Sequence, residues 1–305
     1  MTRMIASPYA ADLESIPVRE HRAEVRGSST AWWEYGPEDG PLIVAVHGFR
    51  GDHHGLEPVV AKLPGYRIAV PDLPGFGASA TFERGPHDIE AYAEWLADFA
   101  VACGAADVSA RGGEWTLLGH SFGSIVTSAA VAAGLAPDRL VLLNPIGAPA
   151  LEGPRAVMTR LAIAYYRAAA ALPERAGFAL LRNPAIVRVM SVTMAKTRDP
   201  ELRRFIHDQH DRYFSSFEDR DAVLEAFEAS VGHDVREYAP LIDVPTLLVV
   251  AEQDDITPLA AQIRLRPLFA DATLAVIPDV GHLIHYETPD AAAGHIRVFA
   301  EGERA

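Results

Sequence analysis

Three residues with clear chemical potential follow one another along this chain as Ser121, Asp254 and His282. A serine hydroxyl is a weak nucleophile until an imidazole takes its proton. A carboxylate can hold that imidazole in one tautomer and stabilise its protonated form. We therefore expect His282 to act as general base and then as general acid, with Asp254 orienting its ring. The adjacent Asp255 is a second candidate for the acid, and we prefer Asp254.

Ser121 is the central residue of a Gly-His-Ser-Phe-Gly sequence at 119–123, between an apolar run at 115–118 and a small-residue run at 124–130. This pattern predicts a strand, a sharp turn and a helix, with the serine at the apex. The glycines would let strand and helix cross closely, and the helix N-terminus would aim N–H groups at developing negative charge. The alternative is a glycine-rich turn whose serine only caps the helix.

The acid and the histidine each follow an apolar run of their own. Asp254 comes after the run at 244–251, and His282 comes after the run at 272–277. Continuous apolar runs are typical of strands that are buried on both faces. Catalytic groups of open parallel sheets lie beyond the carboxyl ends of the strands. This placement favours the catalytic hypothesis over the helix cap.

The elements that must position these residues alternate between strand and helix patterns. A β-hairpin is expected at about 20–36, and the segments after it alternate between strand and helix patterns. The further expected strands are 42–46, 66–70, 115–118, 140–143, 244–251 and 272–277, and the expected helices include 56–63, 89–102, 124–130 and 291–300. Such alternation predicts an α/β fold with a doubly wound, mostly parallel sheet.

The alternation stops near Gly147, and no buried strand is expected before about Tyr238. This stretch instead shows helical spacing and is punctuated by prolines. The expected helices are 158–172, 176–181, 184–194, 202–213 and 223–231. We therefore expect a core domain made of residues 1–146 and 239–305, interrupted by a helical insertion of residues 147–238.

The loop after the first parallel strand has the sequence His-Gly-Phe-Arg-Gly at 47–51 and should lie beside the serine turn. We expect the backbone N–H groups of Phe49 and Phe122 to form an oxyanion hole, each contributing roughly 3 kcal/mol of barrier lowering. His47 is expected to be structural and bonded to the loop that it begins. His53 and His54 are expected as exposed loop residues.

Direct substrate contacts are expected from three residues near the serine: Arg50, Ile146 and Leu283. On the plainer interpretation, Arg50 is an exposed loop residue at the mouth of the cavity. The apolar character of Phe49, Phe122 and Ile146 suggests an apolar acyl or alcohol group, although core packing explains the same residues.

In this order, the motifs resemble those of the α/β-hydrolase fold family. The matching segments are 47–49, 72–77 (Asp-Leu-Pro-Gly-Phe-Gly), 119–123, 254–258 and Gly281-His282. The resemblance extends from about residue 30 to residue 300. It implies that the helical insertion is a cap over the active site and that the substrate cavity lies between cap and sheet. It also implies that His282, rather than the nearby His285, is the base.

The composition is that of an ordinary globular protein: 305 residues, 49% hydrophobic and 22% charged. A formal net charge of −14 argues against a nucleic-acid partner. No secretory signal or membrane-spanning run is expected, so a cytoplasmic location is predicted.

The lone Cys103 is expected to be a buried thiol. No organic cofactor is implied. Metal binding is not expected, because no acidic or cysteine partner was recognised at ligand spacing from His53 and His54. The oligomeric state stays open between monomer and homodimer.

The leading functional hypothesis is a serine hydrolase that cleaves a carboxylic ester of a small or medium apolar molecule through an acyl-enzyme. The first alternative keeps the same catalytic residues and changes the bond, to a carbon–carbon bond, a lactone, an amide or a thioester. Carbon–carbon hydrolysis would favour a polar group such as Arg50, Arg182 or Arg188. The second alternative is a non-catalytic receptor that binds a small molecule in the same fold.

Overall fold

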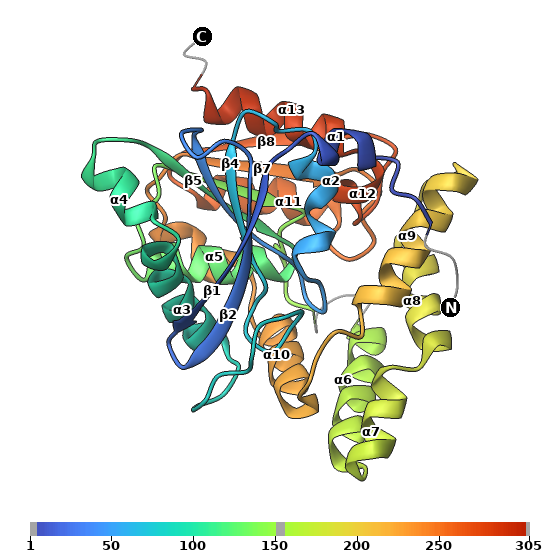
Figure 1. Cartoon of the computed structure of the whole chain (residues 1–305). Helices are drawn as coiled ribbons and strands as arrows, with labels where there is room; N and C mark the ends of the chain where they lie inside the picture. The colour runs from blue at the N-terminus through green and yellow to red at the C-terminus, as the bar shows by residue number, and fades with distance from the viewer. Residues whose placement is uncertain (1–4, 151–155, 303–305) are drawn as a thin grey trace.

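The computed structural model describes residues 5–150 and 156–302, and an eight-stranded sheet forms its centre (Figure 1). The strands are β1 (Val18–Val25), β2 (Ser28–Tyr35), β3 (Leu42–Val46), β4 (Arg67–Pro71), β5 (Trp115–His120), β6 (Arg139–Leu143), β7 (Thr246–Ala251) and β8 (Ala272–Ile277). Their order across the sheet is β1-β2-β4-β3-β5-β6-β7-β8. The β1–β2 and β2–β4 pairs are antiparallel and the other pairs are parallel. The prediction of an α/β fold with a mostly parallel sheet is confirmed.

The helices flank this sheet on both faces or lie between β6 and β7. The α-helices are α1 (Ala10–Glu14), α2 (Glu57–Val60), α3 (Ile89–Ala102), α4 (Ala105–Ala110), α5 (Phe122–Ala132), α6 (Ala156–Ala171), α7 (Glu174–Leu181), α8 (Pro184–Met194), α9 (Pro200–Tyr213), α10 (Arg220–Gly232), α11 (Leu259–Leu265), α12 (Ile284–Glu287) and α13 (Pro289–Ala300). The short 3-10 helices are η1 (His53–Gly55), η2 (Val235–Glu237), η3 (Ala239–Leu241) and η4 (Arg266–Leu268).

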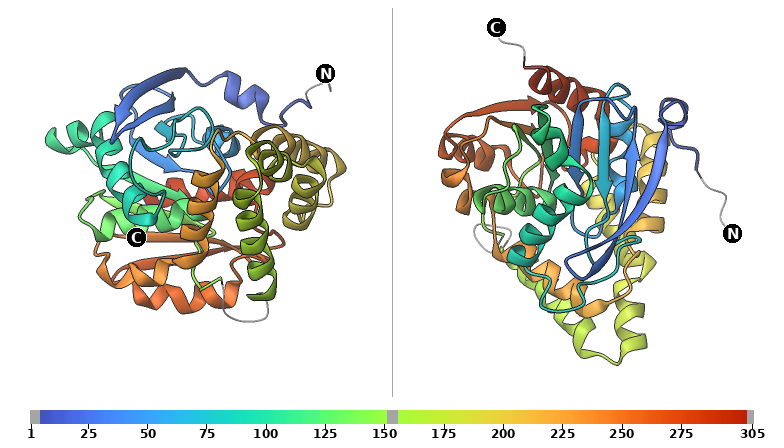
Figure 2. Two further views of the ribbon diagram at one scale, coloured as in Figure 1. Left: turned by 90° about the horizontal axis from the view of Figure 1, so that it is seen from below. Right: turned by 60° about the vertical axis from the view of Figure 1, so that its left-hand side comes forward.

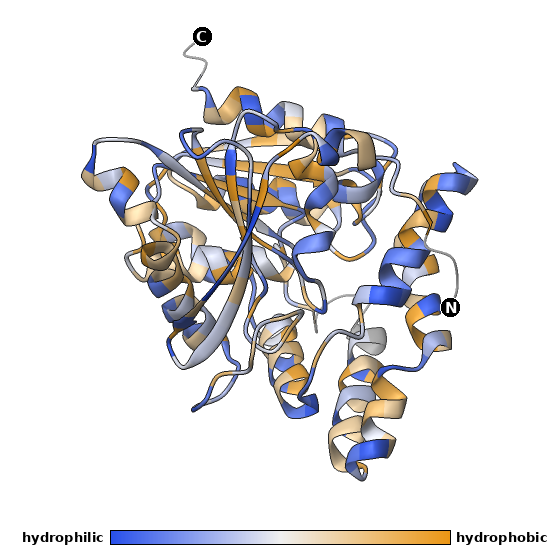
Figure 3. Cartoon of the chain, in the orientation of Figure 1, coloured by the Kyte–Doolittle hydropathy of each residue, from blue (hydrophilic) through white to orange (hydrophobic). Residues whose placement is uncertain are grey.

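Alternate residues of each central strand pack into two different hydrophobic layers. In β3, Leu42, Val44 and Val46 share a core cluster with α3 and α5, whereas Ile43 and Ala45 share one with α2 and α13. This division follows from the two-residue periodicity of a strand. Because both layers are apolar, every residue of β3 is buried, which explains its continuous apolar run. The central strands are accordingly largely orange in the hydropathy view, whereas the β1–β2 hairpin is largely blue and pale (Figure 3).

The helices α6 to α10 all come from the chain between β6 and β7, and they stand beside the sheet rather than within it (Figures 1 and 2). Helix α6 packs against α7 and α10, and α8 packs against α9. A separate apolar cluster joins α9 to α12 through Phe205, Ile206, Leu283 and Tyr286. The insertion is therefore attached to the core beside the residues that follow β8.

Short elements account for the differences from the sequence-based expectations. Helices α4 and α11 were not predicted, and α2 is shorter than the expected 56–63. Each spans two turns or fewer, which is too short for a periodic pattern to stand out. Cys103 is buried, and burial raises the pKa of its thiol to about 12. Within residues 5–150 and 156–302, no helix combines the length and apolarity that crossing a membrane requires.

Candidate active site

Ser121 occupies the junction between β5 and α5 in a strained backbone conformation, with φ 53° and ψ −117°. Gly119 and Gly123, on either side of Ser121, are needed because neighbouring backbone lies too close for a side chain at these positions. A Cβ atom on Gly119 would lie 2.5 Å from the Gly123 carbonyl oxygen, and one on Gly123 would lie 2.4 Å from the Val46 carbonyl oxygen. The Ser121 side chain makes no capping bond to α5. The alternative that this serine only caps the helix is therefore wrong.

A line of hydrogen bonds joins Ser121, His282 and Asp254. The Ser121 hydroxyl lies 2.8 Å from Nε2 of His282, and Nδ1 of His282 lies 2.8 Å from Oδ2 of Asp254. The hydroxyl of Thr257 donates to the same carboxylate oxygen at 2.5 Å. The neighbouring Asp255 points elsewhere and forms an ion pair with Lys196. The structure thus brings Asp254, and not Asp255, to the imidazole.

Electrostatics keep the Asp254 carboxylate ionised. Burial alone would raise its pKa, but attraction to the His282 imidazole and hydrogen bonds from His282 and Thr257 outweigh burial and hold the pKa well below its usual range. The backbone N–H groups of Ile256 and Thr257 also donate to Oδ1 of Asp254, at 2.6 and 2.9 Å. A permanently charged carboxylate at this point can fix the tautomer of His282 and stabilise its protonated form.

Two supporting residues were missed by the sequence analysis. Asn144 follows β6 with φ 43°, donates to the His282 carbonyl at 2.9 Å and accepts from the Ala251 N–H at 2.8 Å. Ser124 donates to the Ser121 carbonyl at 2.5 Å. A polar residue at the end of a buried strand was the available signal for Asn144, since Asn144 directly follows the apolar residues of β6.

The loop after β3 lies against the serine turn. A Cβ atom on Gly48 would lie 3.2 Å from Cβ of Ser121. Phe49 and Phe122 both line the cavity that contains Ser121. Neither of their backbone N–H groups donates to a backbone carbonyl in the part of the chain that the structure describes. His47 bonds to the Gly48 carbonyl and to the Leu73 N–H, at 2.8 and 2.9 Å, as expected of a residue that shapes this loop.

Arg50 is buried, in contrast to the expectation of an exposed loop residue, with only 1% of its surface accessible. Its guanidinium donates to the carbonyls of Leu181 at 2.9 Å and Phe214 at 2.8 Å. It also lies 3.3 Å from the Tyr166 hydroxyl and over the ring of Phe217. All of these partners lie in the α6–α10 insertion. Arg50 lines the cavity, but its charged group is bonded to protein.

A cavity of about 1130 Å³ opens onto Ser121 and His282 and extends between the core and the insertion. Ile146 and Leu283, the other two expected substrate contacts, both line it. Helices α6, α8, α9 and α10 contribute the remaining walls, which are mostly apolar. This volume suits a small or medium organic molecule.

Two further buried histidines lie near the hydrogen-bonded line without belonging to it. The ring of His120 lies 4.1 Å from that of His285 and 5.5 Å from that of His282, and it is tilted relative to both. Burial, followed by repulsion from His282, lowers the pKa of His120 to about 3, so its ring stays neutral. His285 forms no hydrogen bond with Ser121, whose partner is His282.

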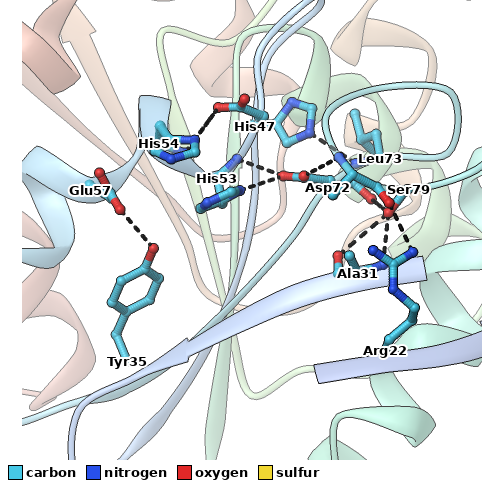
Figure 4. Close-up of polar contacts among 12 residues, drawn as sticks. Arg22, Ala31, Tyr35, His47, His53, His54, Glu57, Asp72, Leu73 and Ser79 are labelled. Atoms are coloured by element: carbon cyan, nitrogen blue, oxygen red, sulfur yellow. Dashed lines mark hydrogen bonds and ion pairs between the residues drawn. The ribbon is translucent and has the colours of Figure 1, made fainter. Parts of the chain in front are cut away.

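Asp52, His53 and His54 form the one cluster with metal-ligand spacing within the described residues. The earlier expectation overlooked Asp52, which supplies an acidic partner, and His53 is buried rather than exposed. Figure 4 shows Nδ1 of His53 bonded to Asp72, at 2.9 Å. Nδ1 of His54 bonds to Asp52 at 3.2 Å. These bonds fit a structural network, and a metal held through either Nδ1 atom would have to replace them.

Comparison with known proteins matches most of the chain to one protein family. Residues 43–295 match the family described as "Alpha/beta hydrolase family". The "Dihydrolipoyllysine-residue acetyltransferase component of acetoin cleaving system" of Pseudomonas putida is 29% identical over 88% of this chain and 66% of that protein. The "Magnesium-chelatase 30 kDa subunit" of Rhodobacter capsulatus is 27% identical over 94% of this chain and 96% of that protein.

A solved esterase from Thermogutta terrifontis superposes with a TM-score of 0.71 and is 24% identical, covering 92% of this chain and 98% of its own. At this identity the likeness shows a shared fold. The names of the three proteins describe different functions. A function for this chain must therefore be argued from its own residues.

Proposed function

Because this chain belongs to the alpha/beta hydrolase family, we propose that it hydrolyses a carboxylic ester of a small or medium, mainly apolar molecule. Ser121 is the nucleophile, His282 the general base and acid, and Asp254 the orienting carboxylate. The single observation that carries this proposal is the line of hydrogen bonds from Ser121 through His282 to Asp254, each 2.8 Å long, at the wall of the cavity.

The proposed reaction has two stages, which are formation of an acyl-enzyme and its hydrolysis. His282 takes the hydroxyl proton while the Ser121 oxygen bonds to the ester carbonyl carbon, and the carbonyl oxygen becomes negative. The N–H groups of Phe49 and Phe122 stabilise that charge. His282 then returns the proton to the leaving alcohol, which departs and leaves an acyl-enzyme. In the second stage, His282 takes a proton from water while the water oxygen bonds to the acyl carbon. His282 then returns the proton to Ser121 as the carboxylic acid leaves.

The insertion of residues 147–238 is proposed to act as a cap that excludes water from this cavity. The cavity walls drawn from α6, α8, α9 and α10 support this role. Water exclusion strengthens each electrostatic interaction with the developing negative charge.

The arginines offered for carbon–carbon hydrolysis are engaged by protein groups. Arg50 bonds to carbonyls of the insertion, Arg182 donates to the Phe217 carbonyl, and Arg188 pairs with Asp211. Each of these guanidinium groups is already bonded to protein. We therefore prefer ester hydrolysis to carbon–carbon hydrolysis. Lactones, amides and thioesters share the same acyl chemistry and belong in the same substrate panel.

Covalent labelling tests the proposal directly. A fluorophosphonate should add to wild-type protein at Ser121, as found by peptide mass spectrometry, and should not label Ser121→Ala. A panel of 4-nitrophenyl esters of graded acyl length should then show turnover in the wild type and none above background in Ser121→Ala. Absence of both labelling and turnover would favour the receptor hypothesis.

A further inference from the structure

The cavity has two chemically different sides. Gln209, His210 and Tyr213 of α9 line it together with Tyr286 of α12. Gln209 and Tyr213 stand one helical turn apart and so share a face of α9. The rings of His210 and Tyr286 lie 5.8 Å apart. We call these four residues the α9–α12 wall.

The opposite side carries hydrocarbon groups. Ala162 of α6 and Phe227 and Val231 of α10 line the cavity there, with Ile146 after β6. Thr159 of α6 and Ser230 of α10 also line this side, so it is mainly but not wholly apolar.

Two polar groups of the α9–α12 wall have no partner in the described part of the protein. Gln209 and Tyr286 line the cavity, and neither side chain forms a hydrogen bond within residues 5–150 and 156–302. Their polar atoms are open to the cavity, unlike Nε2 of His210, which is buried and, among the described residues, unpaired while its Nδ1 lies 2.7 Å from the Ser191 hydroxyl. An occupant of the cavity can therefore form hydrogen bonds with Gln209 and Tyr286.

The wall is uncharged. Burial, followed by repulsion from the carboxylates of Asp52 and Glu57, raises the pKa of Tyr286 well above its usual range, so its hydroxyl stays protonated. Burial lowers the pKa of His210 to about 3, so its ring stays neutral. Charged side chains of both signs, among them Asp52, Lys196 and Arg264, also line the cavity but do not belong to this wall. The wall thus offers neutral donors and acceptors.

We propose that the α9–α12 wall is a subsite for an uncharged hydroxyl- or carbonyl-bearing group of the substrate, while the opposite side holds the hydrocarbon part. This inference rests on the proposed function, because it names the substrate class of the same cavity. The substrate is then an ester with one apolar part and one neutral, oxygen-bearing part.

Binding of uncleavable probes tests the subsite independently of catalysis. Calorimetry on the full-length wild-type chain compares 1-O-butylglycerol with butyl propyl ether, which has the same chain and lacks both hydroxyls. We expect the glycerol ether to bind about tenfold more tightly, which is the effect of roughly one net neutral hydrogen bond. Equal affinity of the two ethers would overturn the proposal.

Single substitutions assign the preference to the wall. Gln209→Leu and Tyr286→Phe should each bring the affinity ratio of the two ethers close to one. Tyr66→Phe is the matched control, since it removes a hydroxyl that bonds to Glu301 and does not line the cavity. A ratio that persists in both wall variants, or that falls equally in the control, contradicts the assignment.

Turnover of 4-nitrophenyl hexanoate by the same wild-type preparation separates the two proposals. If the ester is cleaved and the ethers bind equally, the subsite fails while the proposed function stands. If the ester is not cleaved and the variants abolish a preference for the glycerol ether, the proposed function fails while the subsite stands.

Discussion

Arg50 and Leu181 are 131 positions apart in the sequence, and a hydrogen bond of 2.9 Å from the guanidinium to the backbone carbonyl joins them. Leu181 is the last residue of α7, where carbonyl groups have no partner within the helix. Arg50 directly follows Phe49, the proposed oxyanion donor. The loop that stabilises the transition state and the helical insertion are thus attached to each other through one buried cation.

Replacing Arg50 should therefore affect catalysis as well as stability. Arg50→Gln should lower kcat/KM about tenfold or more and lower the melting temperature, because hydrogen bonds to charged groups contribute about 1.5–3 kcal/mol each. Ester turnover and thermal unfolding measure the two effects. Arg204→Gln, an exposed change in the same insertion, is the control. Wild-type values for Arg50→Gln would show that this attachment is unimportant.

The adjacent pair Asp254 and Asp255 provides a matched test of the acid. Asp254→Asn should reduce kcat by about 10⁴-fold, because an amide favours the wrong tautomer of His282. Asp255→Asn breaks a part-exposed ion pair with Lys196, away from the imidazole, and should change kcat less than about fivefold. Steady-state turnover of one ester by both proteins decides the matter. Comparable losses in the two variants would contradict the assignment of Asp254.

The buried neutral histidines make stability depend on pH. The pKa of His120 falls to about 3 in the folded protein, whereas an unfolded histidine titrates near 6.5. Between these values the unfolded chain binds the extra proton, so stability decreases as pH falls below about 6.5. Melting temperatures from pH 7 to pH 5 should fall less steeply in His120→Gln than in the wild type.

The exposed His295 supplies the control for this pH experiment. His295→Gln should keep the slope of the wild type, because the substitution leaves the buried histidines unchanged. If His120→Gln and His295→Gln behaved alike, burial of His120 would not be the cause of the pH dependence.

The crossing of β5 and α5 should tolerate no side chain at Gly123. Gly123→Ala would place a methyl group 2.4 Å from the Val46 carbonyl oxygen and should cost about 3 kcal/mol or more. Gly294→Ala in α13 meets no atom within 4 Å and should be neutral or stabilising by roughly 0.5–1 kcal/mol. Soluble yield and urea unfolding compare the two, and equal midpoints would refute this explanation of the glycine.

The parts of the fold that local sequence encodes were predictable. The apolar runs identified β3 and β8 to the residue. β3 is buried on both faces, which leaves little room for polar side chains. The expectation of burial on both faces is wrong for β8, an edge strand in which only Ala272 and Ile277 are buried. The Gly-His-Ser-Phe-Gly sequence likewise indicated a serine between strand and helix. These features are encoded by residues that are neighbours in the chain, so a single sequence is enough to recognise them.

Other features depend on partners far away in the chain and could not be predicted. Nothing near Arg50 indicates that its guanidinium reaches Leu181, and nothing near Gln209 indicates that α9 faces a cavity shared with α12. The choice between Asp254 and Asp255 also required the direction in which each side chain leaves its loop. Burial of these groups is set by tertiary packing, which local periodicity does not report.

The Ser191 hydroxyl lies between two imidazoles, 2.7 Å from Nδ1 of His210 and 2.6 Å from Nδ1 of His207. It carries one hydrogen, so it donates to one ring and accepts from the other. When it donates to His210, the far nitrogen of that ring presents N–H; when it accepts, the same nitrogen presents a lone pair. A shift of hydrogens along this line, completed by loss of the Nε2 proton of His210 and uptake of a proton at Nε2 of His207, would thus change that His210 nitrogen from donor to acceptor without any atom heavier than hydrogen changing place.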